Sequence, residues 1–338
     1  MMTFQTRTGA TLSAAALATG ITAITLSGQT PTPNTVDAHV AAAKAAAGTE
    51  HTSVFNGLCA APAAPGQTPA RGRGAGPQQG PPPRAQWHAE PAKVFDNLLF
   101  VGQTEYTAWA VTTSDGIIVI DPLWDYSVED EIVEGLKKLG HDPRTIKYVL
   151  VSHGHLDHVG GARLLQERFG ARVVMSEADW DLVERTSGSW PKPKRDVVAT
   201  DGQRLTLGDT TLTLTLTPGH TPGTISTIVP VKDQGRAHVA ALWGGTGFNF
   251  TITPDKPRKY WFEQYINSAQ RFRDVVAKAG ADVLIANHPN QDNAKAKLAA
   301  LAARKPGDRH PFVVGNDSVT RYVTMVGECA RAGLLRQQ

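Results

Sequence analysis

The chain has 338 residues, of which 41% are hydrophobic, so it can bury a substantial core in one large or two medium domains. The formal net charge is only +3, and much of the arginine lies in an irregular stretch that includes Arg71, Arg73 and Arg84. A charge this weak gives no case for nucleic acid as a partner, because nucleic-acid binding needs a strongly basic face.

Residues 1–28 contain one basic residue, Arg7, then an apolar run rich in alanine, threonine and leucine, then small residues. This pattern is typical of a weak secretory signal peptide cleaved near Gly28, and it predicts a secreted or periplasmic protein. The alternative is a disordered Ala/Thr-rich tail. The run is too short and too polar for a convincing membrane span, so stable membrane insertion is not expected.

Residues 29–86 are rich in Ala, Pro and Gly and are predicted to form a flexible N-terminal arm, with at most a short helix over 40–47. The folded domain is expected to cover 87–338. Two cysteines, Cys59 and Cys329, lie near opposite ends of the mature chain. In an oxidising compartment they could form a disulfide, but two separate buried thiols are the alternative, because their distance cannot be read from the sequence.

Apolar runs bounded by turn residues predict strands at 97–102, 107–113, 116–121, 146–151, 171–175, 203–207, 210–217, 226–231, 238–243 and 282–286. Helical periodicity predicts helices at 128–139, 161–169, 177–185, 259–279, 293–304 and 318–333. Two β-rich halves, each followed by helices, predict an α+β fold. The expected architecture is a four-layer αβ/βα sandwich with a site on the shared edge of two sheets.

The run over 146–151 leads into Ser-His-Gly-His-Leu-Asp-His, which places His153, His155, Asp157 and His158 within six residues. Imidazole and carboxylate together suit zinc and related divalent ions. The first two histidines alternate along the chain, whereas Asp157 and His158 turn toward a second point. Chance surface histidines are the alternative, but four ligand-type residues in this arrangement favour a two-metal site.

Two later strands also end in a histidine. The strand over 210–217 is followed by Pro-Gly-His220-Thr-Pro-Gly, and the strand over 282–286 is followed by Asn287-His288-Pro. Either histidine alone would be interpreted as structural. Together with the cluster they make five histidines and one aspartate at strand-to-loop junctions, where ligand-bearing loops would meet.

These three motifs resemble those of the metallo-β-lactamase-fold hydrolases, and the resemblance runs from about residue 87 to about residue 303. The six-residue His-Gly-His-Leu-Asp-His motif is specific for that fold and much less specific for substrate. The resemblance implies two zinc ions per chain. The first would be bound by His153, His155 and His220, and the second by Asp157, His158 and His288.

The superfamily often adds a bridging aspartate between the third and last histidines, and some lactamases have a cysteine there. This chain has no acid or cysteine between Asp233 and Asp255. In that respect it is similar to the third subclass of class B β-lactamases. The absence also argues against glyoxalase-like hydrolases, homoserine-lactone lactonases and ribonucleases of this fold, which usually keep the aspartate.

The resemblance therefore implies an enzyme that hydrolyses a small-molecule substrate, with the cyclic amide of β-lactams as the first expectation. A hydroxide generated at the two metals would be the nucleophile, and Asp157 would orient it as the catalytic side chain. Lactamases of the similar subclass usually have a serine near Gly245. Glycine there favours the alternative, a zinc hydrolase of another small ester, lactone or thioester with little β-lactamase activity.

A metal-stabilised binding protein is a third hypothesis. It is disfavoured because structural zinc sites are normally closed by four ligands, whereas three per metal leave room for water. Candidate substrate contacts are Tyr106, Trp190, Gly245 and Thr246. Candidate acceptors for the outer ring nitrogens of His220 and His288 are Thr221, Thr224 and Asp121.

Overall fold

Two β-sheets enclose a buried apolar core in the computed structural model, which describes residues 1–3, 33–59 and 81–338. Every element below belongs to the unit from Pro33 to Gln338. The expected signal peptide and most of the Pro/Gly-rich stretch lie outside the described residues.

The larger sheet has seven strands in simple sequence order, β1 to β7. Its first four strands pair antiparallel and its last four pair parallel. Its strands are β1 (Ala92–Phe95), β2 (Leu98–Phe100), β3 (Trp109–Thr113), β4 (Gly116–Ile120), β5 (Ile146–Leu150), β6 (Arg172–Ser176) and β7 (Val197–Ala199). The run Ile-Ile-Val-Ile in β4 is buried on both faces, as expected for a strand covered by other layers on each side.

The smaller sheet has five strands in the order β12-β11-β10-β9-β8, and only β11 and β12 pair parallel. Its strands are β8 (Arg204–Leu207), β9 (Thr210–Leu216), β10 (Ile225–Asp233), β11 (Arg236–Leu242) and β12 (Val283–Ile285). Alternation in β9 turns Leu212 and Leu214 into the core between the sheets.

Helices cover the outer face of each sheet. Against the larger sheet lie α3 (Glu134–Lys138), α5 (Ala162–Phe169) and α6 (Glu177–Arg185), which share an apolar cluster with its strands. Against the smaller sheet lie α7 (Arg258–Ala279) and α9 (Asn316–Leu335). The short helix α8 (Ala294–Ala302) packs at the edge of the central core. The expected four-layer αβ/βα sandwich is confirmed.

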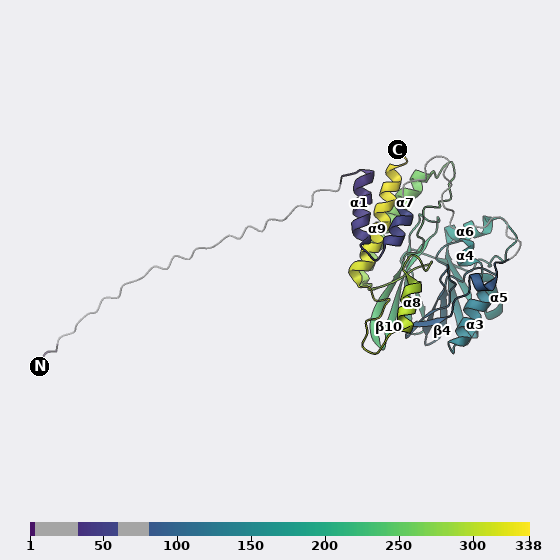
Figure 1. Cartoon of the computed structure of the whole chain (residues 1–338), viewed down its shortest axis with the longest axis horizontal. Coiled ribbons are helices and arrows are strands. Elements are labelled where there is room, and N and C mark those ends of the chain that lie inside the picture. The colour runs from purple at the N-terminus through teal and green to yellow at the C-terminus, as the bar shows by residue number, and fades with distance from the viewer. Residues whose placement is uncertain (4–32, 60–80) are drawn as a thin grey trace. The chain divides into compact units, whose positions relative to one another are not determined.

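The expectation of a flexible arm is wrong for residues 33–59, which form α1 (Val36–Ala47) and α2 (Thr52–Leu58). Figure 1 shows α1 beside α9, and the two helices are in extensive contact. The same alanines that made this stretch resemble a linker allow the close approach, since Ala43, Ala46 and Ala47 are buried. A disulfide joins Cys59, just after α2, to Cys329 in α9, with the Cα atoms 4.8 Å apart.

Three smaller differences from the predicted elements concern short strands and single turns. Strands β1 and β7 were not predicted, because four and three residues are too few to show a period. The helix expected over 128–139 begins as a π-helical turn, η2 (Glu129–Val133), and continues as α3. Two single 3₁₀ turns, η1 (Arg84–Gln86) and η3 (Pro143–Thr145), were also not predicted. Among the described residues, none of the helices has the length and apolarity needed to cross a bilayer.

Candidate metal centre

Three loops bring the ligand-type side chains to one edge of the sandwich. The first loop follows β5 and runs into the short helix α4 (Leu156–Val159). The second follows β9 and carries His220, and the third follows β12 and carries His288. The first loop supplies the remaining four side chains, His153, His155, Asp157 and His158.

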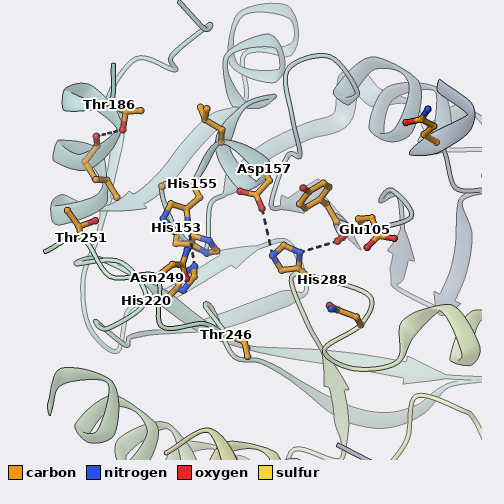
Figure 2. A pocket seen from close by; sticks show the side chains of 16 residues that line it. Glu105, His153, His155, Asp157, Thr186, His220, Thr246, Asn249, Thr251 and His288 are labelled. Atoms are coloured by element: carbon orange, nitrogen blue, oxygen red, sulfur yellow. Dashed lines mark hydrogen bonds and ion pairs between the residues drawn. The ribbon is translucent and has the colours of Figure 1, made fainter. Parts of the chain in front are cut away.

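His153, His155 and His220 form one group, the three-histidine site, in which one nitrogen of each ring lies within 4.8 Å of the others. Within this group His220 Nε2 and His155 Nδ1 lie 3.1 Å apart. His153 Nε2 is buried and has no hydrogen-bond partner. A buried nitrogen without a partner is costly, so the arrangement fits a cation that three lone pairs can share. Figure 2 shows the three rings gathered at one place.

Asp157, His158 and His288 form a second group, the mixed site, within the same 4.8 Å limit. His158 Nε2 lies 3.2 Å from His288 Nε2 and 3.2 Å from Asp157 Oδ2. His288 Nε2 lies 3.7 Å from the same carboxylate oxygen, and Figure 2 shows the two side chains facing each other. The structure therefore brings together the two trios that the sequence motifs predicted, one beside the other.

Backbone carbonyls fix three of the rings. His153 Nδ1 donates to the Gly244 carbonyl at 2.8 Å, and His220 Nδ1 donates to the Gly247 carbonyl at 3.1 Å. His288 Nδ1 donates to the Glu105 carbonyl at 3.0 Å. A proton held on Nδ1 leaves the Nε2 lone pair free for a metal. Thr221 and Thr224, which the sequence suggested as acceptors for His220 and His288, do not contact either ring through an observed hydrogen bond.

Asp121 also has a different partner from the one expected. Its Oδ2 lies 3.1 Å from His158 Nδ1, and it accepts hydrogen bonds from Ser152 Oγ at 2.8 Å and from Asn287 Nδ2 at 2.6 Å. The residue follows β4 with a φ of 58°, a region that aspartate tolerates better than most residues. This left-handed turn aims the carboxylate under the mixed site, so Asp121 fixes the ring of His158.

Burial and mutual repulsion keep most of the histidines neutral in the metal-free protein. Burial lowers the pKa of His220 to about 3 and that of His288 to about 4, and the pKa of His153 and of His155 is lowered by the same cause. His158 is the exception. Burial opposes its protonation, but the charges of Asp157 and Asp121 raise its pKa to about 10. Four neutral imidazoles are therefore already in the state that binds a metal.

Gly244, just after the end of β11 where the chain enters the site, has no room for a side chain. A Cβ added to Gly244 would lie 1.9 Å from the Ile225 carbonyl oxygen. The packing of β11 against the start of β10 thus excludes an acid at this one position, and each trio offers three candidate ligands.

A cavity of about 1040 Å³ opens over both sites. Tyr106 and Thr246, two of the predicted substrate contacts, line it. The ring of Tyr106 lies 5.3 Å from that of His288, and burial raises its pKa to about 12, so its hydroxyl stays protonated at neutral pH. Other lining residues were not among the predicted substrate contacts: Gln86, Glu105, Leu156, Leu182, Thr186, Asn249, Thr251 and Asn290.

The other two predicted substrate contacts lie outside the lining of this cavity. Gly245 packs against the ligand ring instead, since an added Cβ would lie 2.6 Å from the Cβ of His220. Trp190 packs, partly buried, against the apolar cluster under the larger sheet. Trp190 was inferred from the position of its loop and Gly245 from the resemblance, and neither source fixes how a residue packs.

Comparison with protein families matches residues 101–233 to the model described as the metallo-beta-lactamase superfamily. Among solved structures, a subclass B3 metallo-β-lactamase of Bradyrhizobium japonicum is 30% identical, with a TM-score of 0.64 over 74% of this chain and 95% of that chain. A metallo-β-lactamase of Legionella gormanii is 25% identical, with a TM-score of 0.65 over 74% and 97%.

Curated relatives match shorter stretches. A hydroxyacylglutathione hydrolase of Mesorhizobium japonicum is 33% identical over 35% of this chain and 44% of its own length. An N-acyl homoserine lactonase of Azorhizobium caulinodans is 28% identical over 51% of this chain and 70% of its own length. The chain spans about half the length of the first curated relatives that it matches.

Proposed function

Because the chain belongs to the metallo-β-lactamase superfamily, we propose that it is a dinuclear zinc hydrolase that opens the cyclic amide of β-lactams. The observation that carries the proposal is the pair of adjacent three-ligand sites under one cavity. A structural zinc site is closed by four protein ligands, whereas three ligands leave a position for water or substrate.

The donor set fits zinc. Five imidazoles and one carboxylate are borderline to hard ligands, which zinc prefers in hydrolytic sites. The outer nitrogens of four of the rings, those of His153, His158, His220 and His288, face an acceptor. When bound, the two ions supply Lewis acidity, which polarises a scissile carbonyl and lowers the pKa of a water molecule toward neutrality.

The chain's own side chains then position the reactants. Asp157 has an ionised carboxylate, because His158, His288 and His155 together overcome the effect of burial and lower its pKa. One of its oxygens can bind metal while the other accepts a hydrogen bond from the attacking water and directs it at the substrate. The hydroxyl of Tyr106, on the wall beside His288, can donate a hydrogen bond to the substrate.

Two observations support β-lactams as the substrate class. The similarity to the subclass B3 enzyme covers 95% of that chain. The ligand set also lacks a bridging acid, since the chain has no acid or cysteine between Asp233 and Asp255. Full-length similarity is a stronger guide to the whole cavity than the partial matches to the curated relatives.

One observation favours a second candidate, the hydrolysis of a neutral ester, lactone or thioester. β-Lactam drugs carry a carboxylate that a pocket normally has to bind. Among the described residues that line the cavity there is no lysine or arginine, and Glu105 and Asp157 add negative charge. The similarity to a homoserine lactonase points in the same direction.

Export belongs to the same proposal. The expected signal peptide over 1–28 would deliver the protein to the periplasm or outside the cell, and the Cys59–Cys329 disulfide supports an oxidising compartment. The mass of the mature protein isolated from its own host measures the cleavage site. A full-length chain found in the cytosol would contradict this part of the proposal.

The substrate proposal is tested by assaying the zinc-loaded protein on nitrocefin and a carbapenem, then on lactones and thioesters. We expect β-lactam turnover that EDTA abolishes and zinc restores. Cleavage of a lactone or thioester without β-lactam turnover would select the second candidate. Asp157→Asn provides the control, because it keeps the shape of the side chain and removes its charge.

A further inference from the structure

The three-histidine site is assembled from two loops that are far apart in the sequence. His153 and His155 come from the loop after β5, and His220 comes from the loop after β9. Nothing in either loop alone sets the distance between them. Helix α6 begins beside both loops, and its third residue, Asp179, is completely buried there.

The carboxylate of Asp179 joins the two loops. Its Oδ2 accepts a hydrogen bond from the Gly154 N–H at 2.8 Å, and Gly154 lies between His153 and His155. The same oxygen accepts from Thr221 Oγ1 at 2.7 Å, and Oδ1 accepts from the Gly223 N–H at 2.7 Å. All three donors are neutral groups on loops that carry metal ligands.

The local sequence shows that this is not ordinary helix capping. Ser176 caps α6 by accepting from the Asp179 N–H at 3.3 Å. In a capping box the acid at this third position would reach back to the N–H of the capping residue. Asp179 makes its hydrogen bonds with the two loops instead.

The surroundings are shaped to admit the carboxylate. A Cβ on Gly223 would lie 2.9 Å from Asp179 Oδ1 and 1.9 Å from Ser176 Oγ, so only glycine allows this approach. Burying a carboxylate among neutral donors is costly, and burial raises the pKa of Asp179 to about 6. At neutral pH the carboxylate is therefore ionised, held by three hydrogen bonds.

We propose that Asp179 is a positioning residue that holds the His153–His155 loop and the His220 loop at the separation the three-histidine site needs. This inference rests on the proposed function only in requiring that a metal binds there. Removing the link should weaken the three-histidine site and leave the mixed site intact, because Asp157, His158 and His288 have other supports.

Asp179→Asn tests the hydrogen bonds specifically, because it keeps the volume of the side chain. Both carboxylate oxygens face an N–H donor, so an amide nitrogen in either position would place two donors against each other. The effect of losing an outer-shell partner is about 10- to 100-fold in metal affinity. Thr221→Val removes one of the three hydrogen bonds and should have a smaller effect, which Thr221→Ser should restore.

The experiment is a competition titration of the full metal-free chain with Zn²⁺ and a chromophoric chelator, which yields two stepwise affinities. His220→Ala identifies which step belongs to the three-histidine site. Circular dichroism and thermal unfolding establish that each variant is folded. Asp292→Asn is the matched control, since Asp292 is also buried, also has a pKa raised by burial to about 6, and lies on the loop after His288.

We expect Asp179→Asn to weaken the three-histidine step about 10- to 100-fold and the other step less than threefold. The Asp292→Asn control should keep the three-histidine step. Unchanged affinities in folded Asp179→Asn, or equal weakening of both steps, would overturn the inference. If Asp179→Asn does not fold, the comparison of Thr221→Val with Thr221→Ser tests the inference by the same two affinities. The titration needs no substrate, so a protein that hydrolyses nothing could still support the positioning role.

Discussion

Asp121 Oδ2 lies 3.1 Å from His158 Nδ1, and both side chains are completely buried. The contact turns the opposite ring nitrogen, Nε2, toward Asp157 and His288. The mixed site therefore depends on a residue that is 36 positions before Asp157 and is not itself a member of the trio.

Asp121→Ala should weaken zinc binding at the mixed site about 10- to 100-fold, because the ring of His158 loses its orientation and its charge partner. The three-histidine site should keep its affinity. Stepwise zinc titration measures both. Equal weakening of the two sites would show that Asp121 supports the whole fold rather than one ligand.

The raised pKa of His158 predicts a pH dependence that differs between the two sites. At pH 7 its imidazole is protonated in the metal-free protein, since its pKa is about 10, and the proton must leave before a metal binds. Affinity at the mixed site should therefore rise about tenfold per pH unit between pH 7 and pH 9. Affinity at the three-histidine site should stay flat, because its histidines have lowered pKa values.

The stability of the metal-free fold should change with pH in the opposite direction to the metal affinity. The pKa of His158 is higher in the folded chain than in the unfolded chain, so its pairing stabilises the metal-free protein below about pH 6.5. That contribution is lost as the pH rises toward 10.

Calorimetry in two buffers with different ionisation enthalpies measures the protons that are released when each metal ion binds. We expect about one more proton for the mixed-site ion than for the three-histidine ion, and equal release would contradict the assignment.

The ligand trios predict separable metal losses. His153→Ala or His220→Ala should abolish binding at the three-histidine site, because only two of its three protein ligands would remain. His288→Ala should weaken the mixed site selectively. Metal content after dialysis, measured per chain, reports the outcome. The division into two sites is wrong if every one of these variants loses both ions to the same extent.

Gly245→Ser tests whether the missing serine of the similar lactamases can simply be restored. Its Cβ would lie 2.6 Å from that of His220, closer than real side chains approach. We therefore expect loss of zinc from the three-histidine site and lower activity on every substrate, rather than a gain in β-lactamase activity. Gly245→Ala should behave like Gly245→Ser, because the clash begins at Cβ. A folded, zinc-replete Gly245→Ser variant would show that the loop can move.

The metal ligands could be predicted because four of the six lie in one short loop. The strands before His220 and His288 were also recognisable, and strand ends meet at one edge of a sheet. Asp179 could not be found in this way. Its partners are 25, 42 and 44 residues distant in sequence, and an aspartate in the first turn of a helix is already explained by capping.

The N-terminal helices were misjudged for a related reason. An alanine-rich stretch has little hydrophobic contrast, so α1 resembles a linker until α9 provides a surface for it. The cavity wall was also only half predicted. A loop's place in the sequence gives its neighbourhood, but the direction of Trp190 or Gly245 depends on packing with residues that are distant in the chain.

The link between Cys59 and Cys329 spans 270 positions and closes most of the folded chain into a covalent ring. A single protease cut anywhere within that ring would leave the two pieces attached, and the nicked molecule would run as one species on a denaturing gel until a thiol reductant is added. Both sulfurs are buried, so the reductant can reach them only after α2 separates from α9. Nicking can therefore open a loop near the cavity without releasing either half of the metal centre.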